Sequence, residues 1–320
     1  MRWVETMQMP LVSAIVPIYN GERFLAQALD SALAQTWPEL EIIVVDDGST
    51  DASAAIADAY AASHPQVRVI HQANQGLCHA RNTALAAAQG EYFALLDADD
   101  IWLPHHLSDC VAVLECRPEV ALVHADIERI DVDGASLGRN DRLWGRIGDD
   151  PFLALYLRHE HVCCPTAVFR RAAIERVGNF DPQFNRLGCE DRDLWLRMAD
   201  VAQVVFINDL HARYRLHGGN MSGNFSRMLK ARIMLVDKFS ATLRGQALRR
   251  RALAAAHCNL GDELMDAARR RAAFAAYARA FMLLPEQTAV RGMLRSLLKP
   301  HAGRALASSA PAKTAHPPVV

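Results

Sequence analysis

Short apolar runs alternate with amphipathic stretches over the first hundred residues. Four of these runs have the length of β-strands, at residues 11–17, 41–45, 67–70 and 92–96. The first is apolar almost throughout, as expected for a strand that is buried on both faces. The intervening stretches carry apolar residues at helical spacing. Repeated strand–helix units predict an α/β fold with a mainly parallel central sheet flanked by helices.

Polar residues and glycines predict where these helices begin and end. We expect Asn20 to cap the first helix and Asp51 to cap the second, over residues 52–63. The third begins near Leu77, and Gly90 is expected to end it in a left-handed conformation.

The second hundred residues have a less regular pattern. Asp131 and Gly134 suit a hairpin turn, and residues 137–150 are expected to form a loop. Further strands are predicted at 120–123, 166–170 and 213–216, and further helices at 105–116, 152–158, 171–177 and from 188 onward.

Beyond Asn220 the pattern is helical only, and the charge changes sign. Residues 1–222 contain 18 Lys and Arg against 31 Asp and Glu, a net charge of −13, whereas residues 223–300 contain 15 against 5, a net charge of +10. We therefore predict a lead at 1–10, a main domain at 11–222, a C-terminal helical region at 223–300 and a disordered tail at 301–320.

Composition excludes several classes of protein. The seven scattered cysteines match neither a zinc pattern nor a disulfide framework. Residues 1–10 lack the apolar core of a signal peptide, and no run approaches the roughly 20 apolar residues of a membrane span. No nucleic-acid-binding module is recognisable. A cytoplasmic protein with reduced cysteines is the simplest interpretation.

Acidic residues follow two of the predicted strands. Asp97 and Asp99 would lie on one face of an extended chain, where two carboxylates repel unless a cation lies between them. Mg²⁺ or Mn²⁺ carrying a substrate's phosphates would satisfy this arrangement, although a polar turn is the simpler interpretation of these residues alone. Asp46 and Asp47 end another strand, and ligands of parallel sheets bind beyond such carboxyl ends.

Several motifs together resemble glycosyltransferase family 2, which has the GT-A fold. They occur in family order: Val12 to Gly21, Val45 to Asp51, Asn74 to Gly76, Ala80 to Asn82, Leu96 to Asp100, Glu190-Asp191 and Tyr214 to His217. The resemblance covers roughly residues 11–222, and it implies a nucleotide-sugar half (11–104) and an acceptor half (105–222). The C-terminal helices lie outside it.

The resemblance implies a role for residues near the first strands. Pro17 and Tyr19 would form the floor of the nucleotide pocket, and Asp47 would contact a uracil or thymine base. We expect Asp46 to stabilise its turn. Arg81, close to the positive end of a helix, would bind a diphosphate or a carboxylate, with a surface salt bridge as the alternative.

The resemblance also implies a metal site. Asp99 would bind the cation, and Asp97 would hold the ribose or support the metal. His217 would complete the metal site or contact the diphosphate, although a lone histidine is more often structural. Asp100 is expected to be a cap or a structural acid.

Asp191 matches the family's catalytic base, with Glu190 as its rival. On a helix Asp191 shares a face with Trp195 and Met198. Asp193 has Arg197 four residues further on, which predicts an ordinary surface pair. Cys163 and Cys164 lie where the family often builds its acceptor pocket, and we assign them to packing.

Together these features predict an inverting, metal-dependent transferase using a UDP- or dTDP-sugar. A saccharide, a lipid-linked molecule or a protein would be the acceptor, in bacterial polysaccharide, lipopolysaccharide or glycan synthesis. The alternatives are a nucleotidyltransferase of related fold and a non-catalytic nucleotide-sugar-binding scaffold. The basic C-terminal helices would contact the inner membrane face, or would form a helical packing unit or a dimer surface, which we favour.

Overall fold

One mixed sheet lies at the centre of the computed structural model, which describes residues 9–139, 150–157, 162–220 and 224–297. Over those ranges the sheet has nine strands. They are β1 (Val12–Ile18), β2 (Leu40–Asp46), β3 (Val67–His71), β4 (Tyr92–Leu95), β5 (Ile101–Trp102), β6 (Val120–Ile130), β7 (Ser136–Arg139), β8 (Val168–Arg170) and β9 (Gln203–Arg215).

Helices cover the sheet and continue beyond it. They are α1 (Leu25–Leu33), α2 (Ser53–Ser63), α3 (Leu77–Ala87), α4 (His106–Cys116), α5 (Pro151–Tyr156), α6 (Arg171–Val177), α7 (Glu190–Ala199), α8 (Phe225–Phe239), α9 (Leu243–Asp266), α10 (Arg270–Leu283) and α11 (Gln287–Leu297).

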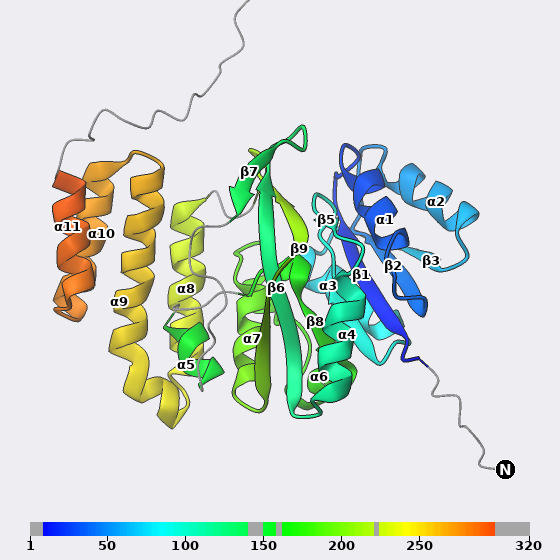
Figure 1. Ribbon diagram of the computed structural model, residues 1–320. Coiled ribbons are helices and arrows are strands. Elements are labelled where there is room, and N and C mark those ends of the chain that lie inside the picture. The colour runs from blue at the N-terminus through cyan, green and yellow to red at the C-terminus, as the bar shows by residue number, and fades with distance from the viewer. Residues whose placement is uncertain (1–8, 140–149, 158–161, 221–223, 298–320) are drawn as a thin grey trace, which may run out of the picture.

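The strand order is β3-β2-β1-β4-β8-β6-β9-β5, with β7 paired to β6 (Figure 1). The strands β1 to β4 are mutually parallel, as are β6 and β9. The short β8 runs antiparallel to both β4 and β6 and joins the two parallel groups. The predicted mainly parallel sheet flanked by helices is thus confirmed.

Two apolar layers cover the two faces of the sheet. Ile15 of β1 packs in the layer that includes α3 and α7, whereas Ala14 and Val16 pack in the layer that includes α1 and α4. Every residue of β1 is buried. Because both faces are covered, the run reads as almost continuously apolar, as the sequence predicted.

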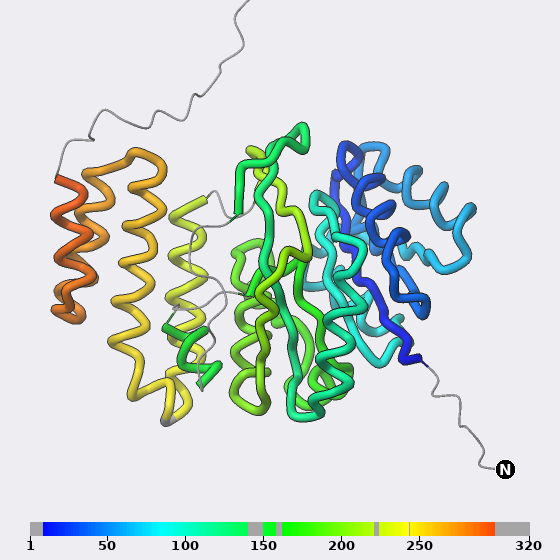
Figure 2. The backbone as a smooth tube through the Cα atoms, viewed as in Figure 1, coloured from blue at the N-terminus to red at the C-terminus, as the bar shows by residue number. Residues whose placement is uncertain are grey.

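The C-terminal helices α8, α9, α10 and α11 pack in sequence, each against the next, on the side of the sheet away from α1 and α2 (Figures 1 and 2). An ionic contact joins α8 to the main body, since Lys238 Nζ lies 2.6 Å from both Asp193 Oδ1 and Asp181 Oδ2. The aromatic side chains of α10 are divided between core and surface, because Tyr277 is buried while Phe274 and Phe281 are exposed.

Three predicted helix ends are wrong. Asn20 does not cap α1 but accepts a hydrogen bond from the Thr50 N–H. Asp51 accepts from Ser53 N, yet the N-cap position of α2 is Ala52. Gly90 lies past the end of α3 and has no positive φ. It is needed for close approach instead, since a Cβ there would lie 2.6 Å from Ser13 Oγ.

The second half contains more strand than its pattern indicated. The predicted strand at 120–123 extends through β6 to Ile130, and the predicted strand at 213–216 is the end of the long β9. The predicted hairpin turn is confirmed, with Asp131 Oδ1 accepting from Ala135 N. However, β7 occupies part of the predicted loop, because it pairs with the exposed edge of β6.

Other predictions fall on residues that are not described. These are most of the lead (1–8), the rest of the loop (140–149), the end of the helix predicted to reach Arg158, and the tail (298–320). The domain boundaries stay a prediction. Among the described helices, none combines the length and the apolar character that a bilayer crossing requires.

Candidate active site

A cleft of about 1460 Å³ opens at the carboxyl ends of β1, β2 and β4. The first turn of α7 and residues of α8 and α9 complete its wall. It is lined by all but one of the predicted site residues, namely Pro17, Tyr19, Asp47, Arg81, Asp97, Asp99 and Asp191. The remaining one, His217, is bonded to Asp99. The fold therefore gathers these separate motifs at one place.

Asp97 and Asp99 meet in a turn rather than along a strand. The strand β4 ends at Leu95, and Asp100 N donates to the Asp97 carbonyl over 3.1 Å. Asp100 is buried and accepts from the Arg215 N–H over 2.9 Å, which confirms its structural role. The predicted alternation thus does not apply here, and the turn is what directs Asp97 and Asp99 to the cleft.

His217 holds Asp99 in place. Its Nε2 lies 2.8 Å from Asp99 Oδ2, and the Gly219 N–H donates to its Nδ1 over 3.1 Å. Since Nδ1 accepts, Nε2 carries the proton and donates it to Asp99. Burial and the charge of Asp97 raise the pKa of Asp99, as expected when two carboxylates share a small space.

This donor set fits a hard divalent cation. Asp97 and Asp99 bring carboxylate oxygens to the cleft, and a cation would relieve their mutual repulsion. His217 could become a ligand only if its proton moved from Nε2 to Nδ1, and that shift would end the hydrogen bond from Gly219. In the present arrangement it positions a carboxylate.

Arg81 links the two acidic groups of the cleft. Its guanidinium donates to Asp97 Oδ1 over 2.7 Å, to Glu190 Oε1 over 2.8 Å and to Cys164 Sγ over 3.2 Å. The side chain is buried and stacks 5.2 Å from the centre of the Phe180 ring. The alternative of a surface salt bridge is therefore wrong, and the charged partners of Arg81 here are two carboxylates in the interior. Contact with a diphosphate stays a prediction.

Glu190 and Asp191 begin α7 after Cys189, which has a left-handed φ of 65°. Glu190 is buried against Arg81, and burial together with the charge of Asp191 raises its pKa to about 7. Asp191 is partly exposed on the cleft wall, and burial raises its pKa as well. The two acids thus face different partners, Glu190 an arginine and Asp191 the cleft.

Asp193 forms the predicted pair with Arg197, but the pair is not at the surface as expected. Asp193 is fully buried. Its carboxylate lies 2.8 Å from Arg197 Nη2 and 2.6 Å from Lys238 Nζ, so it pairs with two cations. Trp195 and Met198 are buried as the helical pattern predicted. The error arises because α8 covers this face of α7, which the local pattern cannot reveal.

Asp46 stabilises its turn as predicted, whereas Asp47 bonds to a different segment. Asp46 accepts from Ser49 N over 3.0 Å and from His71 Nδ1 over 3.0 Å, which fixes its turn. Asp47 accepts from Gln75 N over 2.9 Å and Gly76 N over 2.7 Å, so it orders the loop before α3. Contact between Asp47 and a base stays a prediction.

Several cleft residues escaped the sequence reasoning. Arg186 donates to Asn74 Oδ1 over 2.7 Å at the mouth of the cleft, and Arg232 of α8 pairs with Glu263 of α9. The motif match ends before α8 and α9, so only the packing of these two helices brings Arg232 and Glu263 to the cleft. Cys163 is buried, as expected for a packing residue. Cys164 is half-buried, and its Sγ accepts a hydrogen bond from Arg81.

Solved structures of low sequence identity share this fold. Residues 1–349 of S. aureus TarS in complex with UDP-GlcNAc match with a TM-score of 0.62 at 19% identity, covering 89% of this chain and 89% of that chain. Mannosyltransferase PcManGT from Pyrobaculum calidifontis, in complex with GDP-Man and Mn²⁺, matches with a TM-score of 0.59 at 23% identity, covering 91% and 85%. The predicted GT-A fold is confirmed.

Curated relatives match about two thirds of the chain. An uncharacterised glycosyltransferase of Nostoc sp. is 33% identical over 214 residues, which is 65% of this chain and 66% of the relative. Chondroitin synthase of Escherichia coli is 31% identical over 217 residues, 67% of this chain and 30% of the relative. The chain thus spans from less than a third to about two thirds of these relatives.

The family profile described as "Glycosyl transferase family 2" matches residues 13–178, which is more than half of the chain. The matched span contains the strands β1 to β4 and the turn with Asp97 and Asp99. Fold, motif order and profile agree, and the chain belongs to glycosyl transferase family 2.

Proposed function

We propose that this protein is an inverting glycosyltransferase that moves a sugar from a nucleotide-diphosphate donor to an acceptor hydroxyl. The observation that carries the proposal is the meeting of Asp97, Asp99 and Asp191 in one cleft at the carboxyl ends of parallel strands. Ligands of α/β sheets bind at that edge. Donors of this kind are bound by both solved structures described above.

The nucleotide would occupy the end of the cleft formed by Pro17, Tyr19 and Asp47. Tyr19 is 53% exposed, so its ring is available to a base. Asp47 Oδ2 accepts from Gly76 N and keeps a second lone pair for a base N–H. A UDP- or dTDP-sugar is the donor that we favour, since uracil and thymine offer such an N–H.

Asp97 and Asp99 would hold Mn²⁺ or Mg²⁺, with His217 as the residue that positions Asp99 or joins the ligands. When bound, the cation would stabilise the charge that grows on the departing nucleoside diphosphate. The Mn²⁺ in the mannosyltransferase structure supports this assignment.

Asp191 would act as the general base. Its carboxylate takes the proton from the acceptor hydroxyl as that oxygen attacks the anomeric carbon, on the face opposite the diphosphate. The sugar–phosphate bond breaks, its electrons leave with the nucleoside diphosphate, and the configuration inverts. Glu190 suits this role less, because its carboxylate is already bonded to Arg81.

The acceptor would be a saccharide, a lipid-linked molecule or a protein. The chondroitin synthase relative supports a saccharide and a role in bacterial polysaccharide, lipopolysaccharide or glycan synthesis. All seven cysteines are free, which suits the cytoplasm. Exposed Phe281, Leu294 and Leu297 beside arginines of α10 and α11 suit a peripheral contact with the inner membrane face or a homodimer.

The test is donor turnover by the full chain with Mn²⁺ and a panel of nucleotide sugars. We expect nucleoside diphosphate to be released, and Asp191→Asn to lower kcat by about 10²–10⁴-fold. Asp99→Asn should also abolish the dependence on Mn²⁺. Asp209→Asn, a change at an exposed acid of β9, is the matched control. Full activity in both site variants would refute the site, and release of pyrophosphate would refute the reaction.

A further inference from the structure

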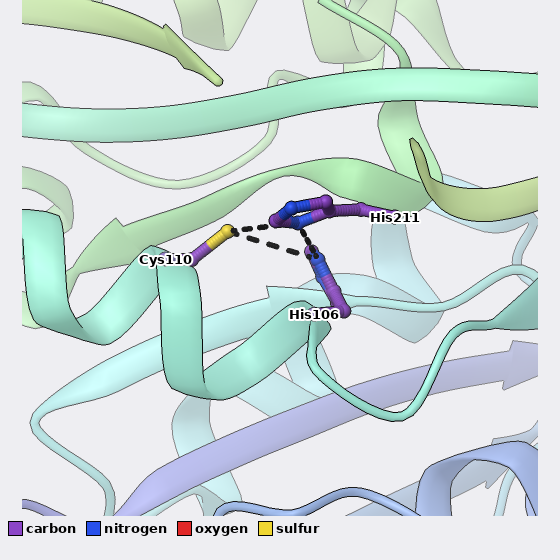
Figure 3. Close-up of side chains that lie close together, drawn as sticks. All are labelled: His106, Cys110 and His211. Atoms are coloured by element: carbon purple, nitrogen blue, oxygen red, sulfur yellow. Dashed lines mark hydrogen bonds between the residues drawn. The ribbon is translucent and has the colours of Figure 1, made fainter. Parts of the chain in front are cut away.

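A second group of ligating side chains lies outside the cleft, between α4 and β9. His106 and Cys110 come from successive turns of α4, and His211 comes from β9 (Figure 3). The Nδ1 atoms of the two histidines are 3.2 Å apart, and Cys110 Sγ lies 3.7 Å from one and 3.8 Å from the other. All three residues are fully buried.

These distances fit a bound metal ion. Zinc bonds of about 2.0–2.1 Å to nitrogen and about 2.3 Å to sulfur, at tetrahedral angles, separate two nitrogens by about 3.3 Å and nitrogen from sulfur by about 3.6 Å. The triangle in Figure 3 has nearly these edges. The three ligand atoms therefore need to move by only a few tenths of an ångström to bind one ion.

Hydrogen bonding alone satisfies this group poorly. Two neutral imidazoles can share one N–H···N bond, but the Nε2 atoms of His106 and His211 are buried with no hydrogen-bond partner among the described residues. Both rings are fully buried, and among the described residues no carboxylate lies within hydrogen-bond distance of either Nε2 atom. An uncharged pair of poorly bonded rings in the core is costly without compensation.

Asp109 lies where a small shift would make it the outer partner that metal-bound histidines usually have. Its Oδ2 lies 3.7 Å from His211 Nε2, on the side of the ring away from Cys110, and its side chain is 47% exposed. A histidine that binds through Nδ1 carries its proton on Nε2, where a carboxylate orients it. Asp109 therefore lies between the protein surface and the buried group of ligands.

We propose that His106, Cys110 and His211 supply three ligands to a thiophilic metal ion of the Zn²⁺ class. The Cys110 thiol loses its proton to solvent on binding, and its thiolate and the two Nδ1 atoms coordinate the ion. This site is distinct from the carboxylate site in the cleft, because sulfur and imidazole select zinc over the harder Mn²⁺ and Mg²⁺.

The ion would fasten the two segments that support the cleft site. His106 follows closely after Asp99, while His211 precedes Arg215 and His217 on or after β9. Arg215 N holds Asp100, and His217 holds Asp99. A metal bound between α4 and β9 would therefore hold together the two segments that Arg215 and His217 already join to Asp100 and Asp99. The metal itself would be buried and would not contact the substrate.

The test is a cobalt titration of the full chain after removal of metals. We expect one equivalent of Co²⁺ to produce the near-ultraviolet thiolate-to-cobalt absorption band, and Zn²⁺ to displace it and to raise the Tm. Cys110→Ala should abolish the band and the Tm shift, while Cys78→Ala, at another buried cysteine, should keep both. Asp99→Asn should keep the band, because it changes only the cleft site.

Asp109→Asn is the variant least exposed to folding defects, since its side chain is half exposed. It should weaken Co²⁺ binding by about 10-fold or more. Absence of the band in the wild type, its persistence in Cys110→Ala, or unchanged affinity in Asp109→Asn would overturn the proposal.

Discussion

Replacing Arg81 with Met tests whether the cleft depends on a buried cation. The side chain keeps about the same length but loses the charge that neutralises Asp97 and Glu190. Glu190 has only 6% of its side chain exposed, whereas Asp97 has 27%. Breaking a buried pair from one side costs about 3–5 kcal/mol, and we assign most of this to Glu190 because solvent screens Asp97.

The loss should depend on pH in a definite direction. In the wild type the pKa of Glu190 is already raised to about 7, and without Arg81 it rises further. A carboxyl with a raised pKa in the folded state binds more protons there than in the unfolded chain, so the free energy of unfolding falls as pH rises between the two pKa values. Above pH 7, the free energy of unfolding of Arg81→Met should therefore fall by up to about 1.4 kcal/mol more per pH unit than that of the wild type. In the wild type, the contribution of Glu190 to this free energy no longer changes above pH 7.

Urea unfolding at pH 6, 7 and 8.5 measures this difference. The matched control is Arg117→Met, since Arg117 and Glu119 form an exposed pair on the surface, and no dependence of its effect on pH is expected because solvent screens the pair. A loss below about 1 kcal/mol in Arg81→Met, with the same pH slope as the wild type, would refute the reasoning.

Three further changes test other parts of the structure. Glu190→Gln should remove the fall in unfolding free energy that the wild type shows from about pH 4.5 to about 7, measured by urea unfolding; an unchanged slope contradicts the raised pKa. Lys238→Met should destabilise the protein by about 1.5–3 kcal/mol, because buried Asp193 loses one of its two cations, and a neutral result would mean that α8 is held by apolar contacts alone. Gly90→Ala should cost about 1–3 kcal/mol through its clash with Ser13, whereas Gly218→Ala, with open space around it, should be neutral; equal melting temperatures would dismiss the clash.

The sequence by itself determined the first half of the fold. The strands β1 to β4 and the helices between them follow from apolar runs and helical spacing, because strands covered on both faces, such as β1, are apolar almost throughout. The motif order identified the family and located the cleft residues from Pro17 to Asp191. Asp46 and Asp100 were also correctly assigned as structural, since turn chemistry is local.

Only the tertiary structure decided which groups meet. Arg81 is buried between Asp97 and Glu190, Asp193 is covered by Lys238, and His106 faces His211, each across a long sequence separation. The extents of β6 and β9 likewise depend on their pairing with each other. Contacts of this kind set burial and charge, and hence pKa, and no local pattern of hydrophobic and polar residues encodes them.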